Sequence, residues 1–379
     1  MINNYEKFFI KDFSIFKDKK VIVRLDLNMP TNQYGEITDI SRLEAVIPFL
    51  KDLSFASAKI IIISHFGEKG ESLKGVADLL ATHINFVKFV GGTDFSFIKE
   101  KAEELKSGDA IILENVRLFP GEMENVESLS RNLASLANIY INDAFSVSHR
   151  EQASVVGIPK YLLSFFGPTF QKEVTNLSKL LTPKKPALLI LGGAKISTKM
   201  NLIKRYLDQE VKVFVGGALA NNIFKQKGVE VGDSFIDPKS SIAESVLYNN
   251  DLLTPTDVTL SNGSKKVLTE LKPGDKIVDC GKETIEGIKE TIEKANTVIM
   301  NGPIGLYEEG FKYGTEALLT LIANKKDGVT FIGGGDTLAV AKGLDIMHKF
   351  SYVSLSGGAM LTYLGEGTLP GIEAIINTK

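Results

Sequence analysis

Nine short runs of β-branched and aliphatic residues recur along the chain, and most are followed by a glycine-containing turn and a helix-like stretch. The runs occupy residues 21–23, 59–63, 110–113, 139–141, 188–191, 212–215, 297–300, 329–332 and 352–354. They are apolar on both faces, as a strand buried between two layers of helices requires. Repetition of strand, turn and helix therefore predicts parallel sheets joined by right-handed crossovers.

The length of the chain favours two such sheets. At roughly 150 residues per domain, 379 residues exceed a single domain. An amphipathic helix is predicted around residues 172–181, and the prolines at 183 and 186 end it. We therefore predict an α/β protein with a first lobe at 1–165, an interdomain helix at 166–185 and a second lobe from 186 to 360.

Composition excludes several classes of protein. Lys plus Arg is 44 and Asp plus Glu is 46, a net charge of −2, which argues against a nucleic-acid or anionic-membrane partner. A single cysteine, Cys280, rules out an internal disulfide and a cysteine-based zinc cluster. No apolar run approaches the 18 or more residues of a membrane span, and charged residues interrupt the N-terminus. We expect an internal, cytoplasmic protein.

The strand ends of the first lobe carry most of the chain's arginines. In open parallel sheets, ligands bind at the carboxyl ends of the strands. Each residue taken singly has a structural alternative: Arg24 would form an ion pair with Asp26, and a lone histidine after a strand is more often structural than catalytic. Together they predict a site for an anionic substrate, because guanidinium groups bind phosphate and carboxylate bidentately. The basic residues in or near these loops are Arg24, Arg42, His65, Arg117, His149 and Arg150.

Glycine-containing loops follow four strands of the second lobe, at 192–193, 216–217, 301–305 and 333–335. Glycine lets backbone N–H groups approach a phosphate, and a helix N-terminus adds positive charge. Lys195 and Lys199 add point charges, and Asp336 would hold Mg²⁺. The alternatives are tight turns and a helix N-cap at Asp336. Neither a P-loop nor a G-x-G-x-x-G motif is present, so the loops predict nucleotide phosphate binding of another kind.

In order along the chain, these loops resemble the motifs of the phosphoglycerate kinase family. VRLDLNMP at 23–30 is similar to the family's V-R-x-D-x-N-x-P, and the other segments match successive family blocks. They are SHFG at 64–67, ENVR at 114–117, DAF at 143–145, HR at 149–150, LGGAK at 191–195, NGPIG at 301–305, GGGD at 333–336, SGGA at 356–359 and LPG at 369–371.

The resemblance implies a glycolytic kinase that transfers a phosphoryl group reversibly between 1,3-bisphosphoglycerate and ADP, giving 3-phosphoglycerate and ATP. It also implies Mg²⁺ bound with the nucleotide, a monomer, two lobes facing each other across a hinged cleft, and a segment 361–379 that returns to the first lobe. Arg42 and Lys195 would be catalytic, and Asp336 would hold the metal. The implied phosphoglycerate ligands are Asp26, Asn28, Arg42, His65, Arg117 and Arg150. The implied nucleotide ligands are Lys195, Lys199, Asn301, Glu308, Gly333, Gly334, Gly335, Asp336 and Thr337.

The chain departs from the family pattern at three places. Glu68 stands where S-H-x-G-R-P has a substrate arginine, so Lys69 would have to turn inward to compensate. The segment SVS at 146–148 replaces G-T-A, and Leu355 and Ser356 replace a hydroxyl and a glycine near the transferred phosphate. We expect weaker substrate affinity. A non-catalytic nucleotide-binding paralogue and a kinase for another phosphorylated carboxylate remain alternatives, although retention of Arg42, Lys195, Lys199 and Asp336 argues against the paralogue.

Overall fold

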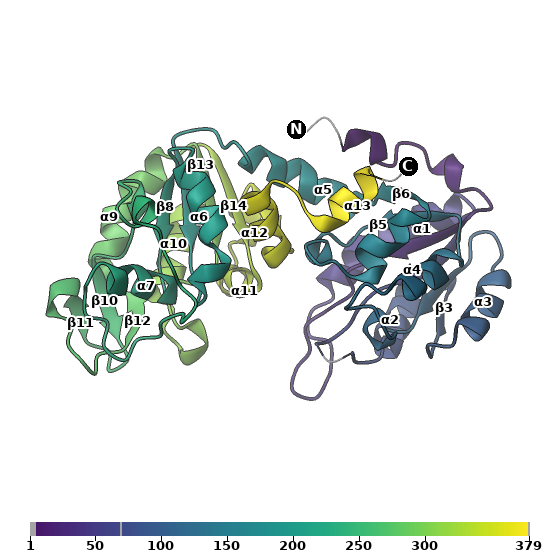
Figure 1. Ribbon diagram of the computed structural model, residues 1–379, viewed down its shortest axis with the longest axis horizontal. Coiled ribbons are helices and arrows are strands. Elements are labelled where there is room, and N and C mark those ends of the chain that lie inside the picture. Colours follow the sequence, from purple (N-terminus) through teal and green to yellow (C-terminus); the bar gives the residue numbers. More distant parts are fainter. Residues whose placement is uncertain (1–4, 69, 378–379) are drawn as a thin grey trace. The chain divides into compact units, whose positions relative to one another are not determined.

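The computed structural model describes residues 5–68 and 70–377. The chain forms two compact units, each built on a six-stranded parallel sheet (Figure 1). The first unit comprises residues 1–175 and 368–379, and the second comprises 176–367. The chain passes from one to the other within α5 (Pro168–Leu177).

The sheet of the first unit has the strand order β3-β4-β2-β1-β5-β6. On one of its faces, Val21, Val23, Ile60 and Ile62 pack against helices α1 and α2 in a single apolar cluster. The strands are β1 (Lys20–Arg24), β2 (Lys59–Ile63), β3 (Val87–Val90), β4 (Ala110–Leu113), β5 (Ile139–Asn142) and β6 (Leu163–Phe166). The helices are α1 (Ser41–Phe55), α2 (Lys74–His83), α3 (Phe95–Glu103), α4 (Glu127–Ala134) and the C-terminal α13 (Pro370–Ile376). Helix α13 is tied to this unit by a hydrogen bond from the Gly371 N–H to the Ser148 carbonyl, at 2.9 Å.

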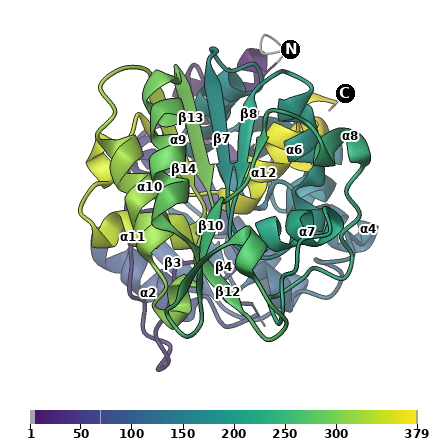
Figure 2. The same cartoon turned by 90° about the vertical axis from the view of Figure 1, so that its left-hand side faces the viewer.

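The sheet of the second unit has the order β15-β14-β13-β7-β8-β9, and helices cover both of its faces (Figure 2). Helices α9, α10 and α11 share one apolar cluster with β7 and β13, and α6 packs with α12 elsewhere in the unit. The strands are β7 (Ala187–Leu191), β8 (Lys212–Val215), β9 (Leu252–Leu253), β13 (Thr297–Asn301), β14 (Val329–Gly333) and β15 (Tyr352–Ser354). The helices are α6 (Met200–Leu207), α7 (Ala218–Gln226), α8 (Glu244–Leu247), α9 (Lys282–Lys294), α10 (Tyr313–Ala323), α11 (Gly335–Gly343) and α12 (Gly357–Glu366).

A small antiparallel sheet lies between β9 and α9 in the sequence of the second unit. Its order is β11-β10-β12, formed by β10 (Asp257–Leu260), β11 (Lys265–Val267) and β12 (Ile277–Cys280). Val258 and Leu260 of β10 form a separate apolar cluster with Leu271, which lies in the connection between β11 and β12. Strands β10 and β12 supply part of a pocket wall.

The prediction of two parallel α/β lobes is confirmed, and all nine apolar runs are strands of the two large sheets. Sequence reasoning missed β3, β6, β9 and the antiparallel sheet. In β3 the charged residue Lys88 is exposed and interrupts the apolar run. Strand β9 has only two residues, which is too short a run to recognise as a strand. None of the described helices is both long and apolar enough to span a bilayer.

Candidate active site

The first candidate site lies where β1, β2 and β4 end, and a neutral histidine is at its centre. His65 is 4% exposed, and burial together with Arg24, Arg117, Arg150 and Arg42 lowers its pKa to about 2. Because four guanidinium groups act on one imidazole, the structure brings all four arginines of these loops together. A cluster of this charge is suited to an anion that carries more than one negative group.

Arg24 has a structural place in this cluster. Its side chain is fully buried, and it donates to the Ser154 hydroxyl at 3.1 Å and to the Leu25 carbonyl at 2.7 Å. Its Nη2 lies 3.3 Å from Nδ1 of His65. The alternative of an Arg24–Asp26 ion pair is wrong, because the carboxylate of Asp26 is paired with Arg42.

Arg42 lies in the first turn of α1 and reaches back to the loop that follows β1. Its Nη1 donates to Oδ2 of Asp26 at 2.6 Å and to the carbonyl of Asn28 at 3.1 Å. Asn28 in turn accepts a hydrogen bond from the Gly67 N–H at 2.8 Å. The residues predicted at the end of β1 are therefore connected to the loop that follows β2.

Arg117 is held from the other side of the same loop. Its Nη1 donates to the carbonyl of Gly67 at 2.5 Å and more weakly to that of Glu68 at 3.4 Å. Its Nε is buried and has no partner among the described residues. Arg150 lies nearby, since its charge lowers the pKa of both Arg117 and His65. An unpartnered guanidinium N–H inside a basic cluster is a donor available to an anionic ligand.

Glu68, the departure from the family pattern, is exposed at this loop. Its charge acts on Arg117 by raising the pKa of that guanidinium, against the larger lowering effects of burial, Arg150 and Arg24. Lys69, which is expected to compensate for Glu68, lies outside the described residues. The exposed carboxylate of Glu68 thus acts electrostatically on Arg117 of the basic cluster.

In the second unit the predicted glycine loops interlock at the ends of β7, β13 and β14. The Gly192 N–H donates to the carbonyl of Asn301 at 2.9 Å, and a Cβ added to Gly192 would lie only 2.0 Å from the Pro303 oxygen. Thr337 is fully buried and accepts the Gly302 N–H at 2.8 Å. Only glycine at 192 permits this approach of two loops, so its role there is steric.

Asn301 is the last residue of β13, and the amide nitrogen of its side chain makes no hydrogen bond to the described residues. The side chain is buried. A Cβ added to Gly334 would lie 3.2 Å from that nitrogen, so the amide faces the glycine loop at the start of α11. A buried donor beside a glycine loop and a helix N-terminus is suited to a phosphate oxygen.

The two predicted lysines differ in their environment. Burial lowers the pKa of Lys199 to about 8, although Asp336 raises it, and its Nζ donates to the Gly192 carbonyl. Lys195 is exposed at the start of the 3₁₀-helix Ile196–Thr198. Both lysines therefore follow β7, one inside the glycine loops and one at their surface.

The sequence predicts Asp336 either as a metal ligand or as a helix N-cap. Its side chain is exposed in the first turn of α11, where Gly334 occupies the cap position and no side chain caps the helix. Within residues 5–68 and 70–377, no group of three or more His, Cys, Asp or Glu side chains is arranged to hold a metal ion. A single carboxylate fits Mg²⁺ that takes its other oxygens from nucleotide phosphates and water, as Mg²⁺ commonly does.

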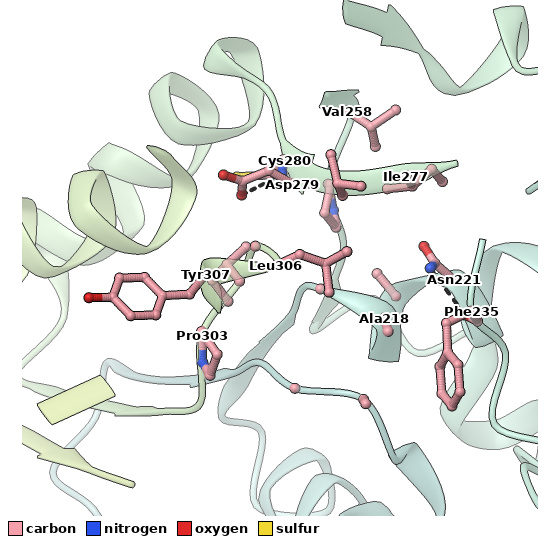
Figure 3. Close-up of a pocket in the computed structure, with 18 of the residues that line it drawn as sticks. Ala218, Asn221, Phe235, Val258, Ile277, Asp279, Cys280, Pro303, Leu306 and Tyr307 are labelled. Carbon is pink, nitrogen blue, oxygen red and sulfur yellow. Dashed lines mark hydrogen bonds between the residues drawn. The ribbon is translucent and has the colours of Figure 1, made fainter. Parts of the chain in front are cut away.

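A pocket of about 270 Å³ opens beside the glycine loops (Figure 3). The predicted residue Glu308 lines it, together with Gly193 and Asp336. Its walls, which the sequence did not reveal, include Ala218, Asn221, Val258, Ile277 and Leu306. These residues come from α7, β10, β12 and the loop after β13. Apart from Asn221 they are apolar, so their sequence does not distinguish them from residues of the hydrophobic core. A mostly apolar pocket next to glycine loops suits a nucleotide base.

The departures at Leu355 and Ser356 also lie by these loops. Ser356 precedes α12, and a Cβ added to the next residue, Gly357, would lie 2.6 Å from Cα of Gly334. Leu355 is 42% exposed. The substituted segment is therefore packed against the glycine loop rather than remote from it.

Comparisons with known proteins give a consistent result. The family model described as "Phosphoglycerate kinase" matches residues 10–367. The chain is 35% identical to the phosphoglycerate kinase of Coprothermobacter proteolyticus over 97% of its own length and 98% of the relative's, and 37% identical to that of a Wolbachia strain over 94% and 96%. Among solved structures, phosphoglycerate kinase from Coxiella burnetii has a TM-score of 0.81 at 32% identity, covering 96% of this chain and 98% of that one. The enzyme from Pyrococcus horikoshii has a TM-score of 0.82 at 28% identity, covering 97% and 98%.

Proposed function

The chain belongs to the phosphoglycerate kinase family, and we propose that its first unit binds the phosphoglycerate while its second unit binds the nucleotide. The protein is a phosphotransferase with a carboxyl acceptor: it transfers a phosphoryl group reversibly from 1,3-bisphosphoglycerate to ADP, giving 3-phosphoglycerate and ATP in glycolysis. What is proposed is the assignment of residues to each step.

The observation that carries the proposal is the group of four arginines acting on His65 in the first unit. A phosphoglycerate has both a phosphate and a carboxylate, so it requires several cations held at a fixed spacing. We assign its binding to Arg42, Arg117 and Arg150. Neutral His65 would add a hydrogen bond without adding charge. Asp26 and Asn28 would orient Arg42 and the 67 loop through the hydrogen bonds that they already make.

The nucleotide would place its base in the pocket and its phosphates at the glycine loops. Glu308 lines the pocket and would accept hydrogen bonds from ribose hydroxyls. The phosphates would meet Lys199, the Asn301 amide, Thr337, and the N–H groups of Gly333, Gly334 and Gly335. Asp336 would hold Mg²⁺, which neutralises phosphate charge when it is bound with the nucleotide.

Phosphoryl transfer requires little covalent chemistry from the protein. The attacking group is already an anion, either a carboxylate or a nucleotide phosphate, so no general base is needed. Catalysis then consists of positioning the substrates and neutralising the charge on the transferred group. We assign this to Arg42 from the first unit and to Lys195 from the second. The exposed ammonium of Lys195 is free to follow the moving phosphoryl group.

We also propose a cytoplasmic monomer, because one chain contains both sets of binding residues and its single cysteine, Cys280, is buried and forms no disulfide. The net charge of −2 gives no reason to expect a nucleic-acid partner. Sedimentation equilibrium on the purified chain tests the monomer directly.

The assignment of the two units is tested by binding calorimetry with each substrate alone. Arg117→Ala should lose 3-phosphoglycerate binding and keep MgADP binding, whereas Lys199→Met should show the reverse pattern. If either variant lost both ligands while its melting temperature stayed near the parent value, the division of labour would be wrong.

A further inference from the structure

Asn221, at the start of α7, lines the pocket, and only one of the two polar atoms of its side-chain amide makes a hydrogen bond to the described residues. The side chain is 1% exposed, and its Nδ2 donates to the Phe235 carbonyl at 3.2 Å. Because a nitrogen must face that carbonyl, the orientation of the amide is fixed. Its Oδ1 then points away from Phe235, on the side of Ile277 in Figure 3. That oxygen has no hydrogen-bond partner among the described residues.

The neighbouring asparagine shows what a purely structural amide looks like in the same helix. Asn222 donates to the Ala218 carbonyl at 2.9 Å and accepts the Asp237 N–H at 3.0 Å, so both ends of its amide are used. Asn222 does not line the pocket. The unused oxygen of Asn221 is thus a property of its position in the pocket wall rather than of helix α7.

Asp279 is the other lining residue with a buried amide or carboxylate side chain, and the protein itself uses its oxygens. The carboxylate of Asp279 accepts the Cys280 N–H at 2.8 Å and the Gly314 N–H at 3.1 Å. Of the buried side-chain atoms without a partner in the described part of the chain, Oδ1 of Asn221 is the one whose residue lines this pocket. Leaving a buried acceptor unpaired is costly, so a ligand that brings an N–H to it gains binding energy.

We infer that Asn221 accepts a hydrogen bond from the exocyclic 6-amino group of the base and thereby makes the enzyme selective for adenine nucleotides. This inference rests on the proposed placing of the base in the pocket. Hypoxanthine and guanine carry a carbonyl oxygen where adenine carries the amino group, so two acceptors would face each other. A pocket built around such a hydrogen bond discriminates far better than an apolar pocket of the same shape.

The unmodified protein provides the first test. Its KM is measured for ATP, for ITP, and for purine riboside 5′-triphosphate, which is ATP without the amino group. Because the riboside leaves the acceptor unpaired, we expect its KM to be about tenfold higher than that of ATP. We expect the KM of ITP to be raised at least as much. Equal KM values for ATP and the riboside overturn the inference.

Asn221→Leu keeps the approximate volume of the side chain and removes the acceptor. It should raise the KM of ATP about tenfold and leave that of the riboside within about twofold, so that the discrimination disappears. Equal losses for the two nucleotides overturn the inference. Asn221→Ser, a smaller change, provides the same comparison if the leucine variant does not fold.

Ile277→Val is the matched control, because it trims an apolar wall that every base would touch. It should raise the KM of ATP and of the riboside by the same factor. If binding calorimetry shows that neither Ile277→Val nor Leu306→Ala changes the affinity of either nucleotide, the base does not occupy this pocket. The placing of the nucleotide then fails together with the inference. Suppose instead that the control variants weaken the binding of both nucleotides, while the unmodified protein has equal KM values for ATP and the riboside. The inference is then overturned, and the placing of the nucleotide stands.

Discussion

Asp26 and Arg42 are joined through a carboxylate oxygen that a third side chain also uses. Oδ2 of Asp26 accepts Nη1 of Arg42 at 2.6 Å and the Ser146 hydroxyl at 2.5 Å, while Oδ1 accepts the Asn28 N–H at 3.2 Å. Ser146 lies where the family pattern has glycine. The guanidinium proposed to meet the transferred phosphoryl group is therefore fixed by a carboxylate that is itself held from two further directions.

Arg42→Ala should lower kcat by about 100-fold or more and leave the melting temperature nearly unchanged. A guanidinium that makes two charge-assisted hydrogen bonds in the transition state is worth about 3 kcal/mol or more. Asp26 would keep the Asn28 and Ser146 donors, so the fold does not depend on Arg42. Steady-state kinetics and thermal unfolding measure the two effects.

Arg131→Ala is the matched control for Arg42. Arg131 is exposed and pairs with Glu127 one helical turn away on α4. Its removal should leave kcat unchanged. A mainly structural loss in Arg42→Ala, with kcat falling only as far as the folded fraction, would remove Arg42 from the catalytic assignment.

Glu68→Arg should lower the KM for 3-phosphoglycerate about tenfold. The change removes a carboxylate that acts on Arg117 and restores one charge-assisted contact to the anion, worth about 1.5–3 kcal/mol when it is fully formed. Asp52→Arg makes the same charge change ten residues beyond Arg42 on α1, roughly 15 Å along the helix, and should alter KM little. Equal effects of the two variants would mean that only net charge matters.

Nine of the twelve strands in the two large sheets were predictable because their sequence signal is strong. A run such as residues 59–63, with four consecutive isoleucines, is typical of a strand buried on both faces. The site loops followed from the same reasoning, since ligand groups gather where parallel strands end. The motifs at 301–305 and 333–337 indeed meet in space, through the hydrogen bond from Gly302 to Thr337.

The base pocket and the pairing inside the arginine cluster were not predictable. Val258 and Ile277 belong to a small antiparallel sheet whose strands are short and irregularly apolar, and nothing local distinguishes a pocket wall from core. Arg24 and Asp26 are two residues apart, which suggests a pair. The actual partner of Asp26 comes from the start of α1, a tertiary contact that spacing along the chain does not reveal.

The affinity for ATP should fall as the pH rises through about 8. Burial lowers the pKa of Lys199 to about 8, so its ammonium group is about nine-tenths charged at pH 7 and about one-tenth charged at pH 9. The pH dependence of kcat/KM for ATP reports the free enzyme and should decline over this range. Lys199→Arg keeps its charge and should flatten the profile. Identical profiles for parent and variant would exclude Lys199 as the titrating group.

His65 should make the protein less stable in mild acid. The pKa of this residue is lowered to about 2 in the folded protein, chiefly by burial, against 6.5 in the unfolded chain. Below pH 6.5 the unfolded state therefore binds a proton that the folded state does not, and stability falls as the pH falls. The loss is about 1.4 kcal/mol per pH unit.

His65→Asn removes this contribution and keeps an acceptor near Arg24. Denaturant unfolding of both proteins without substrate, between pH 6.5 and 5, should show the parent losing about 2 kcal/mol relative to the variant. Parallel pH dependences would mean that His65 takes up its proton in the folded state as well.

The central claim, phosphoryl transfer between the two bound substrates, is tested most directly by one measurement. ATP consumption with 3-phosphoglycerate and Mg²⁺ is followed in a coupled assay for the parent chain, for Lys195→Ala, and for Lys204→Ala, which removes an exposed lysine paired with Asp208. We predict robust turnover in the parent and in Lys204→Ala, and a loss of about 100-fold or more in Lys195→Ala, since that ammonium neutralises charge on the transferred group. No turnover in a parent chain that binds MgATP by calorimetry would contradict the account.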